Sequence, residues 1–380
     1  MRVLMISKAC LVGIYQRKLE ELARLPDVTL KVLVPPSWND RGGRVPLERV
    51  HTEGYDLEAI PIAFNGNYHL HFYPDLGRHV RAFRPDIVHI DEEPYNLATW
   101  QAMRLARAVG AKALFFTWQN LLRGYPPPFR WMEAYNYRHA AYAIAGNQEA
   151  VAVLRAKGFA GPVAVIPQFG VDTDRFAPAD GMPDPAAPFT VGFIGRMVPE
   201  KGVGLLLDAM AGLGGDWRLM YLGDGPARAE LEARVRAMGL ASRVAFRSRV
   251  PSVEMPAYLR RLHVLALPSL TRPNWKEQFG RVLIEAMACG VPVVGSSSGE
   301  IPNVIGDAGL VFPEGDAEAL RAALARLRDD RALWQRLAAA GRARVLAEFT
   351  HAQVAQKTYR VYQSVGAIHE SPLIWKGVSN

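Results

Sequence analysis

Short apolar runs alternate with helix-length segments along almost the whole chain, and this alternation limits the possible folds more than any other feature. Runs typical of buried strands occur at 2–7, 28–34, 86–90, 111–117, 143–145 and 163–166. Segments with helical spacing lie among them at 15–25, 97–109, 132–141 and 148–157. Strands that alternate with helices of this length are typical of parallel sheets covered on both faces. The predicted fold class is therefore α/β.

Residues 180–188 interrupt the alternation with four prolines or glycines and no apolar period, which is typical of a linker. Beyond them, strands are predicted at 189–194, 217–222, 244–247, 264–267 and 291–294. Helices are predicted at 202–210, 227–238, 255–261, 279–287, 317–328 and 331–348. A chain of 380 residues suits two domains. We predict two doubly wound domains, 1–178 and 189–350, with a cleft between them.

Composition excludes several classes of protein. With 49% hydrophobic and 22% charged residues the chain is a folded protein, and no apolar run approaches the length of a membrane-spanning helix. Two cysteines far apart and an N-terminus without secretory features predict a cytoplasmic protein. The net charge of +8 is spread over both halves, which disfavours a nucleic-acid partner and leaves anionic small substrates or an anionic membrane surface.

Ligands of doubly wound sheets bind at the carboxyl ends of the strands. The loops of interest therefore follow Ile6, Ile90, Thr117, Ile194, Leu222 and Leu267. After Ile194 come Gly195 and Arg196, and Lys201 precedes the next helix. Backbone N–H groups at a helix start and two cations could neutralise a diphosphate, although ordinary surface cations would look the same. The absence of G-x-G-x-x-G after any strand disfavours a dinucleotide oxidoreductase.

The most specific segment runs from Glu277 to Val294 and follows the strand that ends at Leu267. Glu277 lies just before a predicted helix and Glu285 about two turns into it. Carboxylates beside a cationic site suit the hydroxyl groups of a sugar or ribose, and the Gly280 N–H could bind a phosphate oxygen. The alternative is an amphipathic helix with an N-terminal acid, which accounts well for Glu277 and poorly for Glu285.

This segment, EQFGRVLIEAMACGVPVV, resembles the signature of the retaining GT-B glycosyltransferases of family 4. Further resemblance lies in GFIGR at 192–196, EKG at 200–202, LGDGP at 222–226, GEIP at 299–302, and the hinge-like stretch 165–176. The resemblance implies a GT-B fold, in which two Rossmann-like doubly wound domains face a central cleft. It also implies that a C-terminal helix at about 352–366 packs back on the first domain.

The family resemblance implies a role for each matching residue, with Arg196, Lys201 and Glu277 catalytic. Donor-binding residues would be Gly13, Gly195, Arg196, Lys201, Arg249, Val250, Glu277, Gln278, Phe279, Gly280 and Glu285. Arg196 and Lys201 would hold the nucleotide diphosphate, Glu285 the ribose and Glu277 the donor sugar. The family further implies retention of anomeric configuration, with no metal and no cofactor.

The first domain is then left to bind the acceptor, and its strand-end loops hold the candidates Tyr15, Glu92, Trp118, Gln119 and Asn120. Glu93 is a further candidate, although solvated loop acids would show the same pattern. Two departures from the family concern this domain. Only Gly13 occupies the first loop, where many members have two glycines, and Gln119 stands where many have a histidine.

Three other features have competing interpretations. Asp172 and Asp174 spell the D-x-D of metal-dependent transferases, but they lie in the hinge-like stretch without a second metal-binding cluster. His89 lies inside a strand run, which slightly favours the core over the cleft. The segment 125–131 combines three prolines with aromatic residues and an arginine, and could pack on the protein, line the acceptor site or touch a membrane.

The leading functional interpretation is transfer of a sugar from a UDP- or GDP-linked donor to a hydroxyl of a glycan or lipid-linked acceptor. The predicted location is cytoplasmic, with peripheral contact to the inner membrane face as an option. A sucrose-phosphate, trehalose-type or glycogen synthase is the second enzymic alternative, although 8–11 lacks the Lys- and Gly-rich loop usual in glycogen synthases. A non-catalytic nucleotide-binding protein is the third, and the presence of all four charged residues of the donor motifs argues against it.

Overall fold

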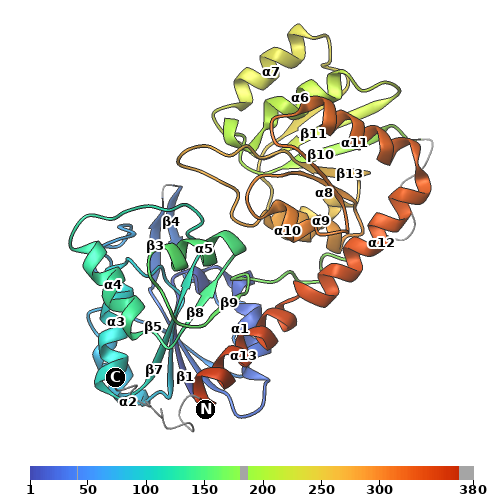
Figure 1. Ribbon diagram of the computed structural model, residues 1–380. Helices are drawn as coiled ribbons and strands as arrows, with labels where there is room; N and C mark the ends of the chain where they lie inside the picture. The colour runs from blue at the N-terminus through green and yellow to red at the C-terminus, as the bar shows by residue number, and fades with distance from the viewer. Residues whose placement is uncertain (41, 180–186, 368–380) are drawn as a thin grey trace, which may run out of the picture. The chain divides into compact units, whose positions relative to one another are not determined.

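The computed structural model describes residues 1–40, 42–179 and 187–367 (Figure 1). The chain forms two compact units, Met1–Gly170 with His351–Asn380, and Val171–Thr350. Most of the predicted linker, 180–186, lies outside the described residues. Residues 171–178 belong to the second unit rather than to the first, because Val171 N–H donates to the Phe349 carbonyl at 2.8 Å and Phe176 lies in the second unit's core.

The first unit contains a seven-stranded sheet in which every strand pair is parallel. Its order is β5-β2-β1-β6-β7-β8-β9. The strands are β1 (Arg2–Ile6), β2 (Thr29–Val34), β5 (Asp56–Ala59), β6 (Ile87–Ile90), β7 (Lys112–Thr117), β8 (Tyr142–Ala145) and β9 (Val163–Val165). A separate antiparallel hairpin pairs β3 (Ser37–Asp40) with β4 (Gly43–Pro46).

Helices cover both faces of this sheet, as its apolar strands require. On one face α1 (Arg17–Ala23) and α13 (His351–Ala367) bury Leu19, Val354 and Tyr362 against β1 and β2. On the other face α2 (Leu76–Phe83), α3 (Leu97–Ala108), α4 (Phe129–His139) and α5 (Gln148–Ala156) pack against the alternate strand residues. Two short 3₁₀ helices, η1 (Ala9–Leu11) and η2 (Gly13–Gln16), precede α1.

The second unit repeats the plan around a six-stranded, all-parallel sheet ordered β12-β11-β10-β13-β14-β15. Its strands are β10 (Phe189–Ile194), β11 (Trp217–Leu222), β12 (Val244–Arg247), β13 (Val264–Leu267), β14 (Val293–Ser296) and β15 (Leu310–Phe312). Its helices are η3 (Pro199–Lys201), α6 (Val203–Ala211), α7 (Arg228–Ala237), α8 (Met255–Leu259), α9 (Arg281–Ala288), α10 (Ile301–Ile305), α11 (Ala317–Asp329) and α12 (Arg331–Glu348). One continuous apolar core joins them.

Each sheet reverses its strand order at one point, and this point locates the ligand-binding crevice of a doubly wound sheet. In the first unit the reversal lies between β1 and β6, and in the second between β10 and β13. Residues that directly follow these four strands are therefore the first to inspect.

The predicted α/β class and parallel sheets are confirmed. The strands and α-helices that the sequence did not predict are short: β3, β4, β5, α2, α10 and β15. The sequence of β5, DLEA, is mostly charged or small and carries no apolar run. The helix predicted from residue 279 begins at Arg281, since Gly280 has a φ of +79° that a helix cannot continue through. Among the described helices, none combines the length and apolarity needed to cross a membrane.

Candidate active site

In the second unit the loop after β10 packs directly on the loop after β13. Gly202 has a φ of +67°, and a Cβ added to it would lie 1.8 Å from the Pro268 carbonyl oxygen. Just beyond, Leu270 N–H donates to the Glu200 carbonyl at 2.8 Å. Only glycine permits so close an approach at this backbone conformation. The contact brings the predicted cation Lys201 beside the residues that follow β13.

Lys201 and Glu277 form an ion pair at this junction. Lys201 Nζ lies 2.5 Å from Glu277 Oε2, and Ser269 Oγ donates to the same oxygen at 3.0 Å. Glu277 is only 6% exposed, so its carboxylate is largely shielded from water, whereas the Lys201 side chain is partly exposed. Lys201 also lies over the Trp275 ring, with 5.0 Å between Nζ and the ring centroid. The structure thus unites two predicted residues that are 76 positions apart in the sequence.

Ser269 and Trp275 were not predicted as residues of this site. Ser269 follows β13 by two residues, so the strand-end rule could have found it. Trp275 carries no local signal, because its contact with Lys201 depends on the fold of the loop.

The Glu277 loop is fixed from its far side by Gly299. A Cβ on Gly299, whose φ is +57°, would lie 2.0 Å from the Glu277 carbonyl oxygen. Glu300 N–H donates to that oxygen at 3.2 Å. The GEIP motif therefore has a physical role: it lets the chain approach and hold the backbone that carries the Glu277 carboxylate.

Helix α9 starts immediately after this loop, with Gly280 at its N-cap position. A helix start presents unpaired backbone N–H groups that suit an anion. Gln278 is exposed and Phe279 is half-buried, with its ring packed edge-on against Phe349 at 5.8 Å. Phe279 therefore anchors the loop, while Gln278 is open to solvent.

Glu285 lies further along α9 and pairs with Arg281, whose Nε is 2.9 Å from Glu285 Oε1. Burial raises the pKa of Glu285 above its ordinary value, and Arg281 opposes the rise. Arg281 was not predicted as part of the site. The i, i+4 spacing of Arg281 and Glu285 on a helix was the signal available in the sequence.

Arg196 differs from these residues because its side chain is exposed and has no hydrogen bond or ion pair within the described residues. The backbone around it is held tightly. Gly195 N–H donates to the Leu222 carbonyl at 3.0 Å, and a Cβ on Gly223 would lie 2.1 Å from the Gly195 carbonyl oxygen. Of the two cations predicted to hold the diphosphate, Lys201 is paired with Glu277, and Arg196 has no such partner in the part of the chain that the structure describes.

The loops after β11 and β12 meet through Asp224. Its carboxylate accepts the Arg249 backbone N–H at 3.0 Å and an Arg228 side-chain N–H at 2.8 Å, and these bonds lower the pKa of Asp224. The Arg249 side chain itself is exposed, and Val250 packs partly on the core. The LGDGP turn thus positions the segment 249–250 that was predicted to lie beside the base.

In the first unit the loops after β1 and β6 meet through two buried pairs. Lys8 Nζ bonds Glu92 Oε2, and Ser7 Oγ donates to Asp91 Oδ2 at 2.6 Å. His71 Nε2 lies 3.7 Å from the same Glu92 oxygen. Burial alone would raise the pKa of Glu92, but Lys8 and His71 outweigh it and lower the pKa to about 2. Glu92 is therefore a buried, ionised carboxylate.

Lys8 and His71 were not predicted as residues of this site. Lys8 lies in the loop after Ile6 that the strand-end rule had selected, so the signal was present. For His71 no signal existed, because its contact with Glu92 follows from tertiary packing.

The side chains of the acceptor candidates after β7 form hydrogen bonds within the protein. Trp118 Nε1 donates to Gln168 Oε1 at 2.9 Å, and its ring fills the space where a Cβ on Gly146 would sit. The Gln119 side chain donates to the Leu121 carbonyl at 3.1 Å and accepts from Lys157 Nζ at 3.3 Å. Asn120 donates to Glu149 Oε2 at 3.4 Å. These contacts support a positioning role for the segment and give no direct sign of an acceptor.

The two candidates before α1, Gly13 and Tyr15, also contact other residues of the protein. Gly13 N–H donates to Glu48 Oε2 at 2.6 Å, so in this structure its donor is already used. Tyr15 stacks on Phe169 with ring centroids 3.8 Å apart. A donor phosphate that bound the Gly13 N–H would have to displace the Glu48 carboxylate.

His89 lies in the core of the first unit. Its Nδ1 is 2.6 Å from the Tyr362 hydroxyl, and burial lowers its pKa to about 4. The slight preference for a core position is confirmed, and His89 ties β6 to α13.

Glu93 is held by two donors, the Thr117 hydroxyl at 2.6 Å and the Trp118 backbone N–H at 2.8 Å. Burial raises its pKa to about 7, although both hydrogen bonds favour the charged form. The carboxyl of an unfolded chain titrates near pH 4.3. Between these values the native protein holds a proton that the unfolded chain has lost.

We expect Glu93 to reduce stability as pH rises from about 4.5 to about 7, by on the order of 3 kcal/mol, because over this range only the unfolded chain gains free energy by releasing the proton. Glu93→Gln should remove this part of the pH dependence. Denaturant unfolding of both proteins between about pH 5 and pH 8 tests it, with the exposed Glu254→Gln as control. Parallel stability curves for wild type and Glu93→Gln would contradict the prediction.

The proline-rich segment 125–131 packs partly on the protein. Tyr125 lies on Tyr95 with centroids 4.3 Å apart, and Phe129 contacts His69 at 5.1 Å. Trp131, in the first turn of α4, is 63% exposed, and nearby in sequence Leu122 is 67% exposed. Packing on the protein is thus observed for Tyr125 and Phe129, while Trp131 is exposed.

Asp172 caps a local turn, since its Oδ1 accepts the N–H groups of Asp174 and Arg175 at 3.1 and 3.3 Å. Across the described ranges, no group of three or more His, Cys, Asp or Glu residues could hold a metal ion. Cys10 and Cys289 are buried free thiols, and burial raises their pKa to about 11 and about 12.

Comparison with known proteins identifies the family and the fold. Residues 188–330 match the family model described as glycosyl transferases group 1, and residues 15–168 match the glycosyl transferase 4-like domain. Phosphatidyl-myo-inositol mannosyltransferase of Mycobacterium leprae is 32% identical over 330 residues, which cover 81% of this chain and 82% of that protein. For 2-deoxystreptamine glucosyltransferase of Streptomyces kanamyceticus the identity is 33%, and the match covers 52% of this chain but only 54% of that protein.

Solved structures share the fold at lower identity. Sucrose-phosphate synthase from Thermosynechococcus elongatus has a TM-score of 0.71 at 21% identity, with 97% of this chain and 100% of that chain covered. A glycosyltransferase from Rickettsia africae ESF-5 has a TM-score of 0.73 at 17% identity, covering 96% and 98%. These likenesses concern the fold alone. The chain therefore belongs to the group 1 glycosyl transferases of family 4, and it has the GT-B fold.

Proposed function

We propose that the protein transfers a hexose from a nucleoside-diphosphate sugar to an acceptor hydroxyl, with the donor bound on the second unit. The observation that carries this proposal is the junction between the β10 and β13 loops, where Lys201, Glu277 and the start of α9 lie at the point of strand-order reversal. A diphosphate needs cations and backbone N–H groups, and a sugar needs carboxylates. This junction offers both.

The chemistry at this site is the departure of a nucleoside diphosphate from the sugar's anomeric carbon. Negative charge grows on the leaving phosphate oxygens as the bond breaks, so fixed positive groups stabilise the transition state more than the bound donor. Arg196 is poised to bind that charge because nothing described in the protein occupies it. Lys201 would share its charge between Glu277 and the phosphate.

Retention of the sugar's configuration is part of the proposal and comes from the family resemblance. In the front-face route usually proposed for this family, the acceptor hydroxyl attacks from the side that the diphosphate leaves. A donor phosphate oxygen takes the acceptor proton. The protein's part is then to hold the donor and to stabilise the leaving group.

The two acids should act on different parts of the donor: Glu285 on the ribose and Glu277 on the hexose. Glu285→Gln should weaken binding of the free nucleoside diphosphate about tenfold, the value of one hydrogen bond to a charged group. Glu277→Gln should spare that binding, because the free diphosphate carries no hexose, and should lower turnover. Calorimetry with the nucleoside diphosphate and a turnover assay separate the two, and the reverse pattern would exchange the roles.

The donor is best identified by a screen of GDP- and UDP-sugars. Relatives from mycobacteria and corynebacteria are described as GDP-mannose-dependent, which makes GDP-mannose the first donor to test. The Anabaena HepE protein of similar fold was crystallised with UDP and glucose, which makes UDP-glucose the second. A donor at about 100 times its dissociation constant should stabilise the fold by about 2.7 kcal/mol.

The same screen tests the proposed reaction and its independence of metal. Release of nucleoside diphosphate should accompany binding of the true donor, and it should continue in EDTA because Arg196 and Lys201 supply the positive charge. Binding of no nucleotide sugar would overturn the proposed function. Loss of activity in EDTA with recovery in manganese would overturn its metal-independent form.

We propose a lipid-linked acceptor at an anionic membrane surface as the more specific form of the function. Relatives are described as acting on phosphatidylinositol mannosides. In this chain Leu122 and Trp131 expose large apolar side chains, with Arg123 and Arg130 beside them in sequence and also exposed. Apolar groups flanked by cations suit the interface of an anionic bilayer.

Replacing Leu122 and Trp131 together by serine should weaken binding to phosphatidylglycerol vesicles at least tenfold, since each buried apolar side chain contributes roughly 1.5–3 kcal/mol. Vesicle sedimentation measures this. Met238→Ser with Leu346→Ser removes two exposed apolar groups from the second unit and serves as the control. Equal binding by both pairs, or no binding by the wild type, would favour an acceptor in solution.

A further inference from the structure

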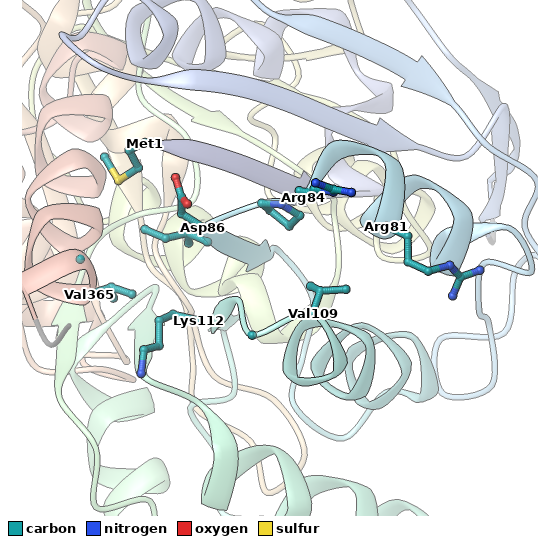
Figure 2. A pocket seen from close by; sticks show the side chains of 11 residues that line it. Met1, Arg81, Arg84, Asp86, Val109, Lys112 and Val365 are labelled. Carbon is teal, nitrogen blue, oxygen red and sulfur yellow. The ribbon is translucent and has the colours of Figure 1, made fainter.

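Cationic side chains of this protein differ in whether a neighbour fixes the direction of their charged end. Three of them, Arg81, Arg84 and Lys112, line a pocket of about 710 Å³ in the first unit, where β6 and β7 begin and α2 and α13 end. Figure 2 shows their charged ends pointing away from one another, so they do not converge on one ligand. Lys201 of the second unit is different, because two side chains meet at its ammonium.

The first of these side chains is Glu277 and the second is Trp275. Glu277 Oε2 lies 2.5 Å from Lys201 Nζ and accepts one of the three N–H donors of the ammonium. The Trp275 ring lies under the same atom, with 5.0 Å from Nζ to the ring centroid, a distance at which the negative face of the ring attracts a cation. Within the described residues, the Lys201 side chain has no further hydrogen bond or ion pair. Its other N–H groups therefore remain available to a bound phosphate.

The Trp275 ring is held in place by the loop to which it belongs. Trp275 and Arg272 close a tight turn, in which the Arg272 N–H donates to the Trp275 carbonyl at 2.7 Å and the Trp275 N–H donates to the Arg272 carbonyl at 3.2 Å. The turn begins next to Thr271, whose backbone N–H and hydroxyl both donate to Glu314 Oε2, at 3.0 and 2.9 Å. The position of the ring therefore has its own support and does not depend on Lys201.

The same loop also holds the backbone next to Lys201, since the Leu270 N–H donates to the Glu200 carbonyl at 2.8 Å. Residues 270–275 thus contact the lysine at both ends, at the backbone beside it and at the ammonium. A lysine side chain is long and flexible, and its free rotamers cost entropy when they are ordered. Contact at both ends limits the positions that Nζ can take before any ligand binds.

A tryptophan beside a lysine can also serve only to cover the aliphatic part of the lysine side chain. The two roles respond differently to substitution. Leucine would still cover the aliphatic part but has no negative ring face. Phenylalanine keeps such a face, although its attraction for a cation is weaker than that of tryptophan.

We propose that Trp275 is a positioning residue for the transfer reaction, whose ring holds the Lys201 ammonium beside Glu277 and ready for the departing diphosphate. The proposal rests on the proposed function, which gives Lys201 its role. Negative charge grows on the phosphate oxygens as the bond to the sugar breaks, and a cation that is already in place stabilises this charge without first having to be ordered. Trp275 acts through Lys201 and not on the donor, so its loss should lower kcat more than it raises KM.

Trp275→Leu should lower kcat about tenfold and change the KM for the donor by less than about threefold, whereas Trp275→Phe should lose less than about threefold in kcat. The matched control is Trp100→Leu on α3 of the first unit, which removes a tryptophan that lies 4.7 Å from the Arg104 guanidinium carbon and should leave kcat unchanged. Equal kcat in Trp275→Leu and wild type would overturn the proposal. So would equal losses in the leucine and phenylalanine variants, or a raised KM with unchanged kcat.

A second measurement does not require turnover. Protons over the face of an aromatic ring resonate upfield, so the Cε methylene of Lys201, labelled with ¹³C, should have an upfield proton shift in the wild type. This signal, assigned with Lys201→Arg, should return to the ordinary lysine position in Trp275→Leu. An ordinary shift in the wild type would overturn the role of Trp275, even in an active enzyme. Failure of every nucleotide sugar in the donor screen would instead overturn the proposed function and leave the NMR result unchanged.

Discussion

Arg196→Ala is expected to lower kcat/KM by two to three orders of magnitude, or roughly 2–4 kcal/mol of transition-state stabilisation, without a measurable change in stability. The catalytic loss follows from the proposed role of Arg196 as a fixed cation beside the departing diphosphate. Stability should not change because the side chain is exposed and makes no hydrogen bond or ion pair with the described protein. For the other charged residues of the donor motifs, a loss of catalysis is harder to separate from a loss of stability.

Lys201 is less suitable for this test, since its removal would leave the Glu277 carboxylate, only 6% exposed, without its cation. A buried carboxylate that loses its partner destabilises the fold, and activity would then fall for two reasons. The matched control for Arg196→Ala is Arg236→Ala, which removes an exposed arginine from α7 of the same unit. Turnover within tenfold of wild type in a folded Arg196→Ala protein would remove Arg196 from the proposed mechanism.

Much of the geometry of the proposed donor side could be predicted because its determinants are local in sequence. Strand β10, the turn at Gly195, and the start of η3 and α6 occupy one short stretch, so the position of Lys201 follows from the order of the elements. The same holds for Glu277, Gly280 and α9. The ion pair between Lys201 and Glu277 could be anticipated as well, because adjacent parallel strands bring their carboxyl ends together.

The proposed acceptor side was harder to predict because its contacts depend on packing between distant segments. Lys8 and Glu92 are 84 residues apart and meet only because β1 and β6 are neighbours. Glutamine and asparagine after β7 had the right chemistry for a sugar hydroxyl, but the amides of Gln119 and Asn120 bond Leu121, Lys157 and Glu149. Composition identifies a group that can form hydrogen bonds, and only the fold decides which partner it finds.

Short strands and short helices were not predicted, for a different reason. Strand β15 has three residues and α10 has five, too few for an apolar period to appear. Neighbouring strands and helices supply the stability that such segments cannot supply alone. The GEIP motif at the start of α10 was recognised by its resemblance, but its role in holding the Glu277 backbone is visible only in the structure.

Gly202→Ala is expected to destabilise the second unit by at least about 3 kcal/mol and to abolish most activity. Two costs combine at this position. A side chain at a φ of +67° costs about 1–2 kcal/mol, and the added Cβ would lie 1.8 Å from the Pro268 carbonyl oxygen, where no real contact is possible. The loop after β13 must then shift, which strains the bond between Leu270 N–H and the Glu200 carbonyl and moves Lys201 relative to Glu277.

Gly239→Ala separates these two costs, because it also places a side chain at a positive φ but causes no steric clash. Gly239 has a φ of +69°, and an added Cβ would meet nothing within 4 Å. It should therefore lose only about 1–2 kcal/mol and keep full activity. Urea unfolding of both variants gives the difference directly, and that difference is the free energy with which the β10 and β13 loops resist separation. Similar losses of unfolding free energy in both variants would mean that the loops can move apart at little cost. The junction would then be too mobile to hold Lys201 and Glu277 in one site.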